Sequence, residues 1–202
     1  MKTRNFTIIV LIVTLIGVFL SWTYQKPEIK TYTTLNDIDQ TIEVAEAPLN
    51  ISFVEFLNQF HVTLVTIIDQ AKTYDGQSVI SFDDYNSQYA SLHRFNNDLS
   101  NELERANNLI GKLDPTSNEI IQIEQDRFSQ LNQLNTELES TVSYLQNFEE
   151  IIYTNKASDA KRYLQELDVH FSKIQELNNR FADLSKTYFE QKTELYNEIE
   201  KK

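Results

Sequence analysis

Three histidines are the side chains of this sequence best suited to bind a metal ion, and each falls in a different predicted helix. They are His61, His93 and His170. A di-iron site in a helical bundle uses Glu-x-x-His pairs on two of the helices. The positions three residues before the histidines hold Asn58, Ala90 and Leu167. Because the required glutamates are missing, the sequence predicts no metal site.

Covalent and acid–base chemistry finds no support in the sequence either. The 202 residues include no cysteine, which removes thiol nucleophiles and thiolate metal ligands. A phosphate-binding loop needs closely spaced glycines, whereas Gly17, Gly76 and Gly111 are far apart. Long helices leave few loops from which to build an oxyanion hole. We therefore predict a protein without enzymatic activity and without a cofactor.

A polar residue follows an apolar one near the middle of each predicted helix, in Phe60-His61, Phe95-Asn96, Leu134-Asn135 and Leu177-Asn178. Counted from the connecting loops, the four polar side chains fall within about one turn of each other in an antiparallel bundle. Such a polar core layer would fix the helix register or line a small polar pocket. The candidates for this layer are His61, Asn96, Asn135 and Asn178. In the alternative, the apolar neighbours occupy the core and the polar side chains face outward.

Long helices are expected to position these side chains. Glycine and proline are scarce, three of each, and apolar residues recur at steps of three and four. The predicted helices span about 51–73, 81–111, 115–153 and 158–200. Short connections make neighbouring helices antiparallel, so residues 50–202 are expected to form an elongated four-helix bundle with coiled-coil-like packing.

An apolar segment near the N-terminus predicts a membrane anchor. Residues 6–22 read FTIIVLIVTLIGVFLSW, which carries no charge and is just long enough to cross a bilayer. A cleaved signal peptide is the alternative, but no small-residue cleavage site closes the segment. The predicted fold class is therefore all-α, with a single N-terminal transmembrane helix before the bundle.

The rest of the N-terminal region completes the predicted domain organisation. Residues 25–49 contain two prolines and a threonine-rich stretch without helical periodicity, which predicts an extended tether. A short basic tail is easily retained inside the cell, so we expect the bundle on the extracytoplasmic side of the cell membrane. The predicted parts are a basic tail at 1–5, a transmembrane signal-anchor helix at 6–24, the tether at 25–49 and the bundle at 50–202.

The charge balance limits the partners that this chain can bind. Its formal net charge of −12 repels phosphate backbones, so a nucleic-acid partner is not expected. A single-pass, membrane-anchored scaffold that binds another protein, or a second copy of itself, fits best. A ligand-binding sensor bundle and a cytoplasm-facing scaffold are the alternatives, and a small-molecule ligand is disfavoured.

Overall fold

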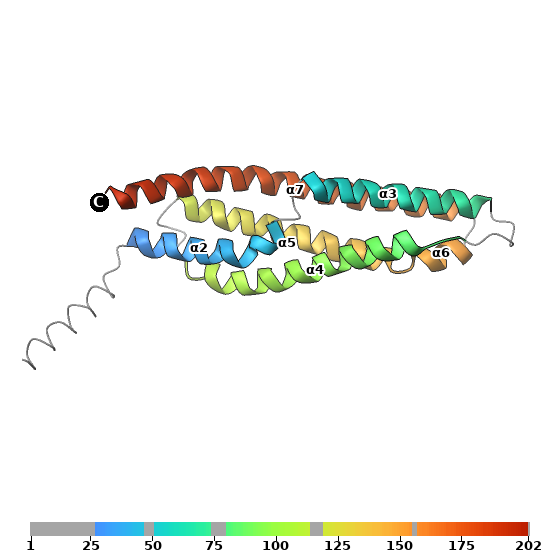
Figure 1. The fold of residues 1–202 in the computed structure, drawn as a ribbon, viewed down its shortest axis with the longest axis horizontal. Helices are drawn as coiled ribbons and strands as arrows, with labels where there is room; N and C mark the ends of the chain where they lie inside the picture. The colour runs from blue at the N-terminus through green and yellow to red at the C-terminus, as the bar shows by residue number, and fades with distance from the viewer. Residues whose placement is uncertain (1–26, 47–50, 74–79, 114–118, 155–156, 202) are drawn as a thin grey trace, which may run out of the picture.

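The computed structural model describes residues 27–46, 51–73, 80–113, 119–154 and 157–201. These residues form an elongated, all-helical bundle, as the sequence predicts (Figure 1). The helices, in chain order, are α2 (Pro27–Glu46), α3 (Ile51–Lys72), α4 (Asp83–Ile110), α5 (Glu119–Leu145), α6 (Phe148–Thr154) and α7 (Ala157–Glu200).

Helix α7 runs along the full length of the bundle, and α2 and α3 share the opposite chain direction beside it (Figure 1). The 44 residues of α7 span about 66 Å at the α-helical rise. Helices α2 and α3, with 20 and 22 residues, follow one another and together match that length. Each packs on both α4 and α7, and α5 packs on α4 and α7 as well. Each half of the bundle therefore has a cross-section of four helices.

The core follows the predicted spacing of three and four residues. In α4 the buried side chains include Tyr85, Leu92, Leu99, Leu103 and Ile110. Equivalent stripes on α5 and α7 face them, and Leu131, Leu134, Leu167 and Ile174 in these stripes have no exposed surface. Burial of each such side chain contributes about 1.5–3 kcal/mol, which makes this seam the main source of stability.

The predicted fold class needs correction in its membrane-spanning part. Within the ranges that the structure describes, no helix is long and apolar enough to cross a membrane. The physical reason is that these helices are amphipathic, and even the most apolar of them, α3, carries Glu55, Asp69 and Lys72. The predicted anchor at 6–24 lies outside the described residues. The expected location at the cell membrane stays a prediction.

The number of helices is also corrected, because the region read as an extended tether contains a helix. Pro27 opens α2, and Glu28 in the first turn suits the helix dipole. The spacing of Leu35, Ile38 and Ile42 then places three fully buried side chains on one face. Three threonine hydroxyls donate to backbone carbonyls one turn earlier, which accommodates Thr33, Thr34 and Thr41 within the helix.

The helix predicted at 115–153 is interrupted after Leu145. Helix α5 ends there and α6 begins at Phe148. The break turns the Phe148 ring into the core, where it packs 5.0 Å from Tyr85 and 5.5 Å from Tyr163, measured between ring centroids. Burial of this aromatic ring offsets the lost helical hydrogen bonds. The described bundle thus contains six helices rather than four.

Candidate functional site

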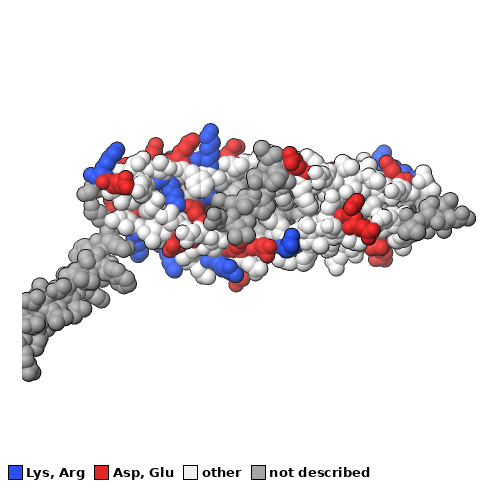
Figure 2. Space-filling model, viewed as in Figure 1, with Lys and Arg blue, Asp and Glu red and all other residues white. Residues whose placement is uncertain are grey.

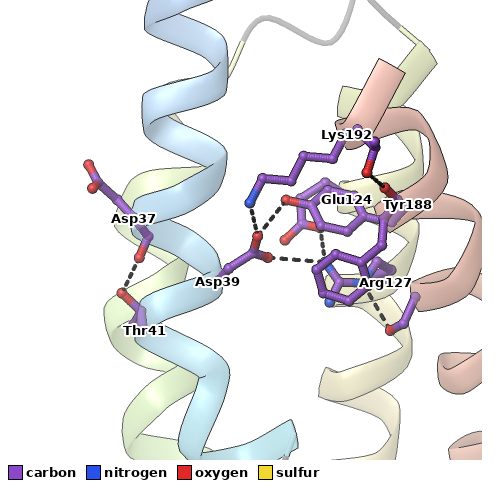
Figure 3. Close-up of polar contacts among 10 residues, drawn as sticks. Asp37, Asp39, Thr41, Glu124, Arg127, Tyr188 and Lys192 are labelled. Atoms are coloured by element: carbon purple, nitrogen blue, oxygen red, sulfur yellow. Dashed lines mark hydrogen bonds and ion pairs between the residues drawn. The ribbon is translucent and has the colours of Figure 1, made fainter. Parts of the chain in front are cut away.

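A layer of paired charges lies inside the half of the bundle that contains α2 (Figure 3). Helix α5 contributes Glu124 and Arg127, which are both fully buried. Helix α2 contributes Asp39, and α7 contributes Tyr188 and Lys192. We call these five residues the charge layer. Its two acidic and two basic side chains compensate one another, which offsets the cost of removing them from water.

The Asp39 carboxylate is the point at which α2 joins this layer. Its Oδ1 atom lies 3.5 Å from Arg127 Nη1. Its Oδ2 atom accepts a hydrogen bond of 3.1 Å from the Tyr188 hydroxyl and another from Lys192 Nζ. On the far side, Arg127 Nη1 donates to Glu124 Oε2 at 2.5 Å. One carboxylate therefore connects α2 to both α5 and α7.

Aromatic rings surround the Arg127 guanidinium. Its Cζ atom lies 4.0 Å from the Tyr188 ring centroid, 5.3 Å from that of Phe189 and 5.4 Å from that of Phe181. Its Nε atom donates to Ser185 Oγ at 3.1 Å. A planar, weakly hydrated guanidinium suits such ring faces better than an ammonium does. Helix α7 therefore holds Arg127 by cation–π contacts as well as by hydrogen bonding.

The phenol of Tyr188 stays neutral in this setting. Burial raises its pKa well above the ordinary value of a tyrosine, and the negative charges of Glu124 and Asp39 raise it further. The neutral hydroxyl can donate to Asp39 but does not act as a base. Glu124 and Arg127 pair within α5, and Asp39 pairs with groups on α5 and α7, so the layer fixes the positions of these three helices relative to one another.

The sequence contains a signal for this layer, but the spacing of apolar residues alone does not reveal it. On α5 the residues Ile120, Glu124, Arg127, Leu131 and Leu134 follow one another at steps of three and four. Two charged residues therefore occupy core positions of an apolar stripe. A Glu and an Arg three residues apart also form common surface pairs, which hides the signal. The partner Asp39 lay in the segment that was predicted to be extended.

Two of the four residues proposed for a polar layer meet in the structure. Asn96 Nδ2 donates to Asn135 Oδ1 at 2.9 Å and to the Asn135 carbonyl at 3.1 Å. Asn135 Nδ2 in turn donates to Ser100 Oγ at 2.9 Å. These bonds join α4 to α5, and Asn96 is buried while Asn135 is half-buried. The two asparagines form a polar contact between the helices.

The other two residues proposed for this layer, His61 and Asn178, lie apart from one another. His61 sits at the edge between α3 and α7, where its Nε2 atom lies 2.9 Å from Asp168 Oδ1. Asn178 is buried on α7, ten residues beyond Asp168, which corresponds to about 15 Å along the helix. Its Oδ1 atom has no hydrogen-bond partner among the described residues. His61 therefore does not lie level with Asn178, because the register of α3 on α7 places it beside Asp168.

The histidines remain separate from one another in the bundle. His93 is exposed on α4, where a ring nitrogen lies 3.0 Å from Asn97 Nδ2 and the ring centroid lies 6.2 Å from that of Tyr89. His170 Nδ1 lies 2.5 Å from Glu137 Oε1, between α7 and α5. In the part of the chain covered by the structure, no three potential metal ligands come together.

Two tyrosine hydroxyls cap backbone carbonyls at the break between α5 and α6. The Tyr85 hydroxyl donates to the Leu145 carbonyl, and the Tyr163 hydroxyl donates to the Tyr144 carbonyl, both at 2.6 Å. These carbonyls are left without helical partners where α5 ends. Burial raises the pKa of both Tyr85 and Tyr163 well above the ordinary value. Both phenols therefore stay protonated and act as caps.

A surface hollow of about 310 Å³ opens beside this break. Its lining includes Tyr144, Arg162 and Glu166. Arg162 Nε lies 3.9 Å from Glu166 Oε1, and the Tyr144 hydroxyl donates to Glu166 Oε2 at 2.5 Å. The Arg162 and Glu166 side chains are more than half exposed and already interact with each other. The hollow therefore presents no buried charged group directed toward a ligand.

The α3 half shows fewer basic side chains than the α2 half on one face of the molecule. On the face drawn in Figure 2, Lys and Arg side chains are more numerous over the half that holds α2, whereas the α3 half is mostly uncharged, with acidic patches and a basic group near its end. Between Glu55 and Asp69, α3 carries no charged residue apart from any charge on His61. Val62 in this stretch is 62% exposed, and Val169 on the adjacent α7 is 70% exposed. We call the surface around these two valines the α3–α7 face.

Comparisons with protein-family models, with curated proteins and with solved structures found no match for this chain. The fold and its surfaces are therefore the observations that bear on function. Together they define an elongated helical bundle with an internal charge layer in one half and, in the other, an exposed stretch of α3 with no Asp, Glu, Lys or Arg residue between Glu55 and Asp69.

Proposed function

We propose that this chain is a non-catalytic helical module that binds another protein through the α3–α7 face. The observation that carries the proposal is the uncharged outward surface of α3, with exposed Val62 near its centre and Val169 on the next helix. Depletion of charged residues distinguishes the centre of a protein interface from the rest of a protein surface. Charged residues make up 24% of the chain, so their absence from α3 between Glu55 and Asp69 distinguishes this part of the surface.

The bundle holds this face in a fixed shape. His61 contacts Asp168 at 2.9 Å, and Gln175 Nε2 lies 3.5 Å from Asn58 Oδ1, so α3 and α7 are joined at two levels. Phe53, Leu57 and Phe60 anchor the inner side of α3. A rigid helical surface loses little conformational entropy when a partner binds. This supports a role in recognition, for which the bundle needs no chemistry of its own.

Site-specific photo-cross-linking in the cells that produce this chain tests the proposal. A photoreactive amino acid at position 62 or 169 should yield a discrete covalent adduct with a partner protein. The matched control places the same residue at Glu104, which is exposed on α4. Val62→Asp should abolish the adduct formed from position 169 while changing stability by only about 0.5 kcal/mol. If the yield of adduct from positions 62 and 169 does not exceed the yield from position 104, the proposed face is refuted.

A further inference from the structure

Two rows of side chains cross the α3–α7 face, one on each helix. In the α3 row, Val62 lies seven residues after Glu55 and seven residues before Asp69, which also binds Lys72 at 2.7 Å. Side chains seven residues apart lie on the same side of an α-helix, about 10 Å apart along its axis. All three members of the row are exposed. The α3 row therefore presents an apolar centre with a carboxylate on either side.

The α7 row has the opposite charge on either side of its valine. Val169 lies seven residues after Arg162, whose side chain is 76% exposed. On its other side, Val169 and Lys173 line the same surface hollow of about 390 Å³. The α7 row therefore presents an apolar centre with a cation on either side.

Each cation of the α7 row already touches a carboxylate on its own helix. Arg162 Nε lies 3.9 Å from Glu166 Oε1, and Lys173 Nζ lies 2.9 Å from Glu176 Oε2. Glu176 also binds Arg180 at 2.5 Å, so two cations share one carboxylate at that end of the row. Exposed pairs of this kind are weak. The cations of the α7 row can therefore bind a further carboxylate from outside the chain.

The two rows are level with one another along the bundle. Helices α3 and α7 run antiparallel, and the contact of His61 with Asp168 at 2.9 Å fixes their register. Counted from this contact, Val62 and Val169 lie within two residues of the same level, which is about 3 Å. The acidic members of the α3 row and the basic members of the α7 row match within the same limit. The rows are therefore complementary in charge and in spacing.

We propose that the partner of the α3–α7 face is a second copy of this chain, rotated by half a turn about an axis that lies in the interface, parallel to the bundle. This inference rests on the proposed function of the face. The rotation leaves levels along the bundle unchanged and lays the α3 row of each copy on the α7 row of the other. The pairs formed, each twice in the dimer, are Glu55 with Lys173, Val62 with Val169, and Asp69 with Arg162.

Charge favours this arrangement over a dimer with the bundles reversed. In the reversed dimer α3 would lie on α3, and Glu55 of one copy would meet Asp69 of the other, which brings like charges together. The 22 residues of α3 are about 33 Å long and two adjacent helices are about 20 Å wide, so the face offers about 600 Å² on each copy. This area is at the lower end for specific interfaces, so we expect a reversible dimer in which both bundles point the same way.

Cross-linking between two single-cysteine chains tests this orientation, because the sequence contains no other cysteine. The full chain with Val62→Cys is mixed with a size-tagged full chain with Val169→Cys and treated with a short bis-maleimide. We expect a heterodimer joined through positions 62 and 169. In the matched control the tagged chain carries Glu104→Cys, which lies on the exposed side of α4. A yield no higher than in this control, or a higher yield of homodimer from Val62→Cys alone, overturns the proposal.

An exchange of charges between the copies gives a second measurement. Glu55→Lys alone makes lysine face lysine at both symmetric contacts, and Lys173→Glu alone makes glutamate face glutamate. Self-association of each variant in sedimentation equilibrium should therefore weaken by about tenfold. A mixture of the two restores an attractive pair at both contacts, and its association should return to the wild-type level. The control variants Glu104→Lys and Lys186→Glu make the same charge changes at exposed positions outside the face and should associate as the wild type does.

The possible outcomes separate this inference from the proposed function. If the full chain sediments as a monomer while photo-cross-linking from positions 62 and 169 yields an adduct with a different protein, the second copy is wrong and the binding face stands. If a dimer forms but the Glu55→Lys and Lys173→Glu variants behave like their controls, association uses another surface and the inference is overturned. If neither a dimer nor an adduct forms, both the inference and the proposed function fail.

Discussion

Replacement of Arg127 by methionine should destabilise the bundle more than any surface substitution of the same kind. The guanidinium is fully buried and bonds Glu124, whose side chain is 1% exposed. Its removal leaves that carboxylate without its nearest cation in the interior, and breaking a buried pair in this way costs about 3–5 kcal/mol. The contact of 4.0 Å with the Tyr188 ring is lost as well. We expect a total loss of about 4 kcal/mol.

Urea unfolding followed by far-ultraviolet circular dichroism measures this loss. With a slope of about 2 kcal/mol per molar urea, the midpoint should fall by about 2 M. The matched control is Arg180→Met, which removes an exposed pair with Glu176 at 2.5 Å. A surface pair of this kind contributes about 0–1 kcal/mol. Indistinguishable midpoints for the two variants would show that the charge layer is not a buried network.

A double variant separates the cost of breaking the pair from the value of the pair itself. In Glu124→Leu/Arg127→Met both members of the pair are apolar, and Asp39 keeps its bonds to Tyr188 and Lys192. Apolar replacement of a whole buried pair is often neutral or stabilising by about 1–4 kcal/mol. We therefore expect the double variant to recover most of the stability lost in Arg127→Met. A further loss would mean that the pair itself is strongly stabilising.

Three further predictions concern the polar contacts and the outer face. Asn96→Ala removes two hydrogen bonds between α4 and α5 and should lower stability by about 1–3 kcal/mol in thermal unfolding. Tyr85→Phe/Tyr163→Phe should lose about 1–3 kcal/mol for each carbonyl left uncapped, measured by urea unfolding at neutral pH. Burial raises the pKa of both tyrosines in the folded state above the unfolded value of about 10. The stability that the two hydroxyls contribute is therefore fully present below about pH 10 and is lost as the pH rises above it. The phenylalanine variant should lose less stability over that alkaline range, and equal slopes would contradict the capping role. Val62→Asp should leave the unfolding midpoint nearly unchanged, whereas a large decrease would place Val62 in the core.

Local sequence patterns were sufficient to predict the helices that pack by simple apolar stripes. Leu92, Leu99 and Leu103 on α4 recur at the expected steps, and the structure buries all of them. The same spacing in Leu35, Ile38 and Ile42 does not by itself predict a helix, because the neighbouring threonines favour extended structure. Packing of α2 on α4 and α7 supplies the stabilisation that local propensity lacks.

The sequence by itself determined the helical class of this protein, because helical periodicity is a property of neighbouring residues. Only the tertiary structure decided which polar residues meet. Asn96 pairs with Asn135, whereas His61 meets Asp168, because the register of α3 on α7 depends on side chains from both helices. Asp39 and Arg127 are 88 residues apart, and no local pattern connects them. Their pairing follows from the packing of three helices around one buried guanidinium.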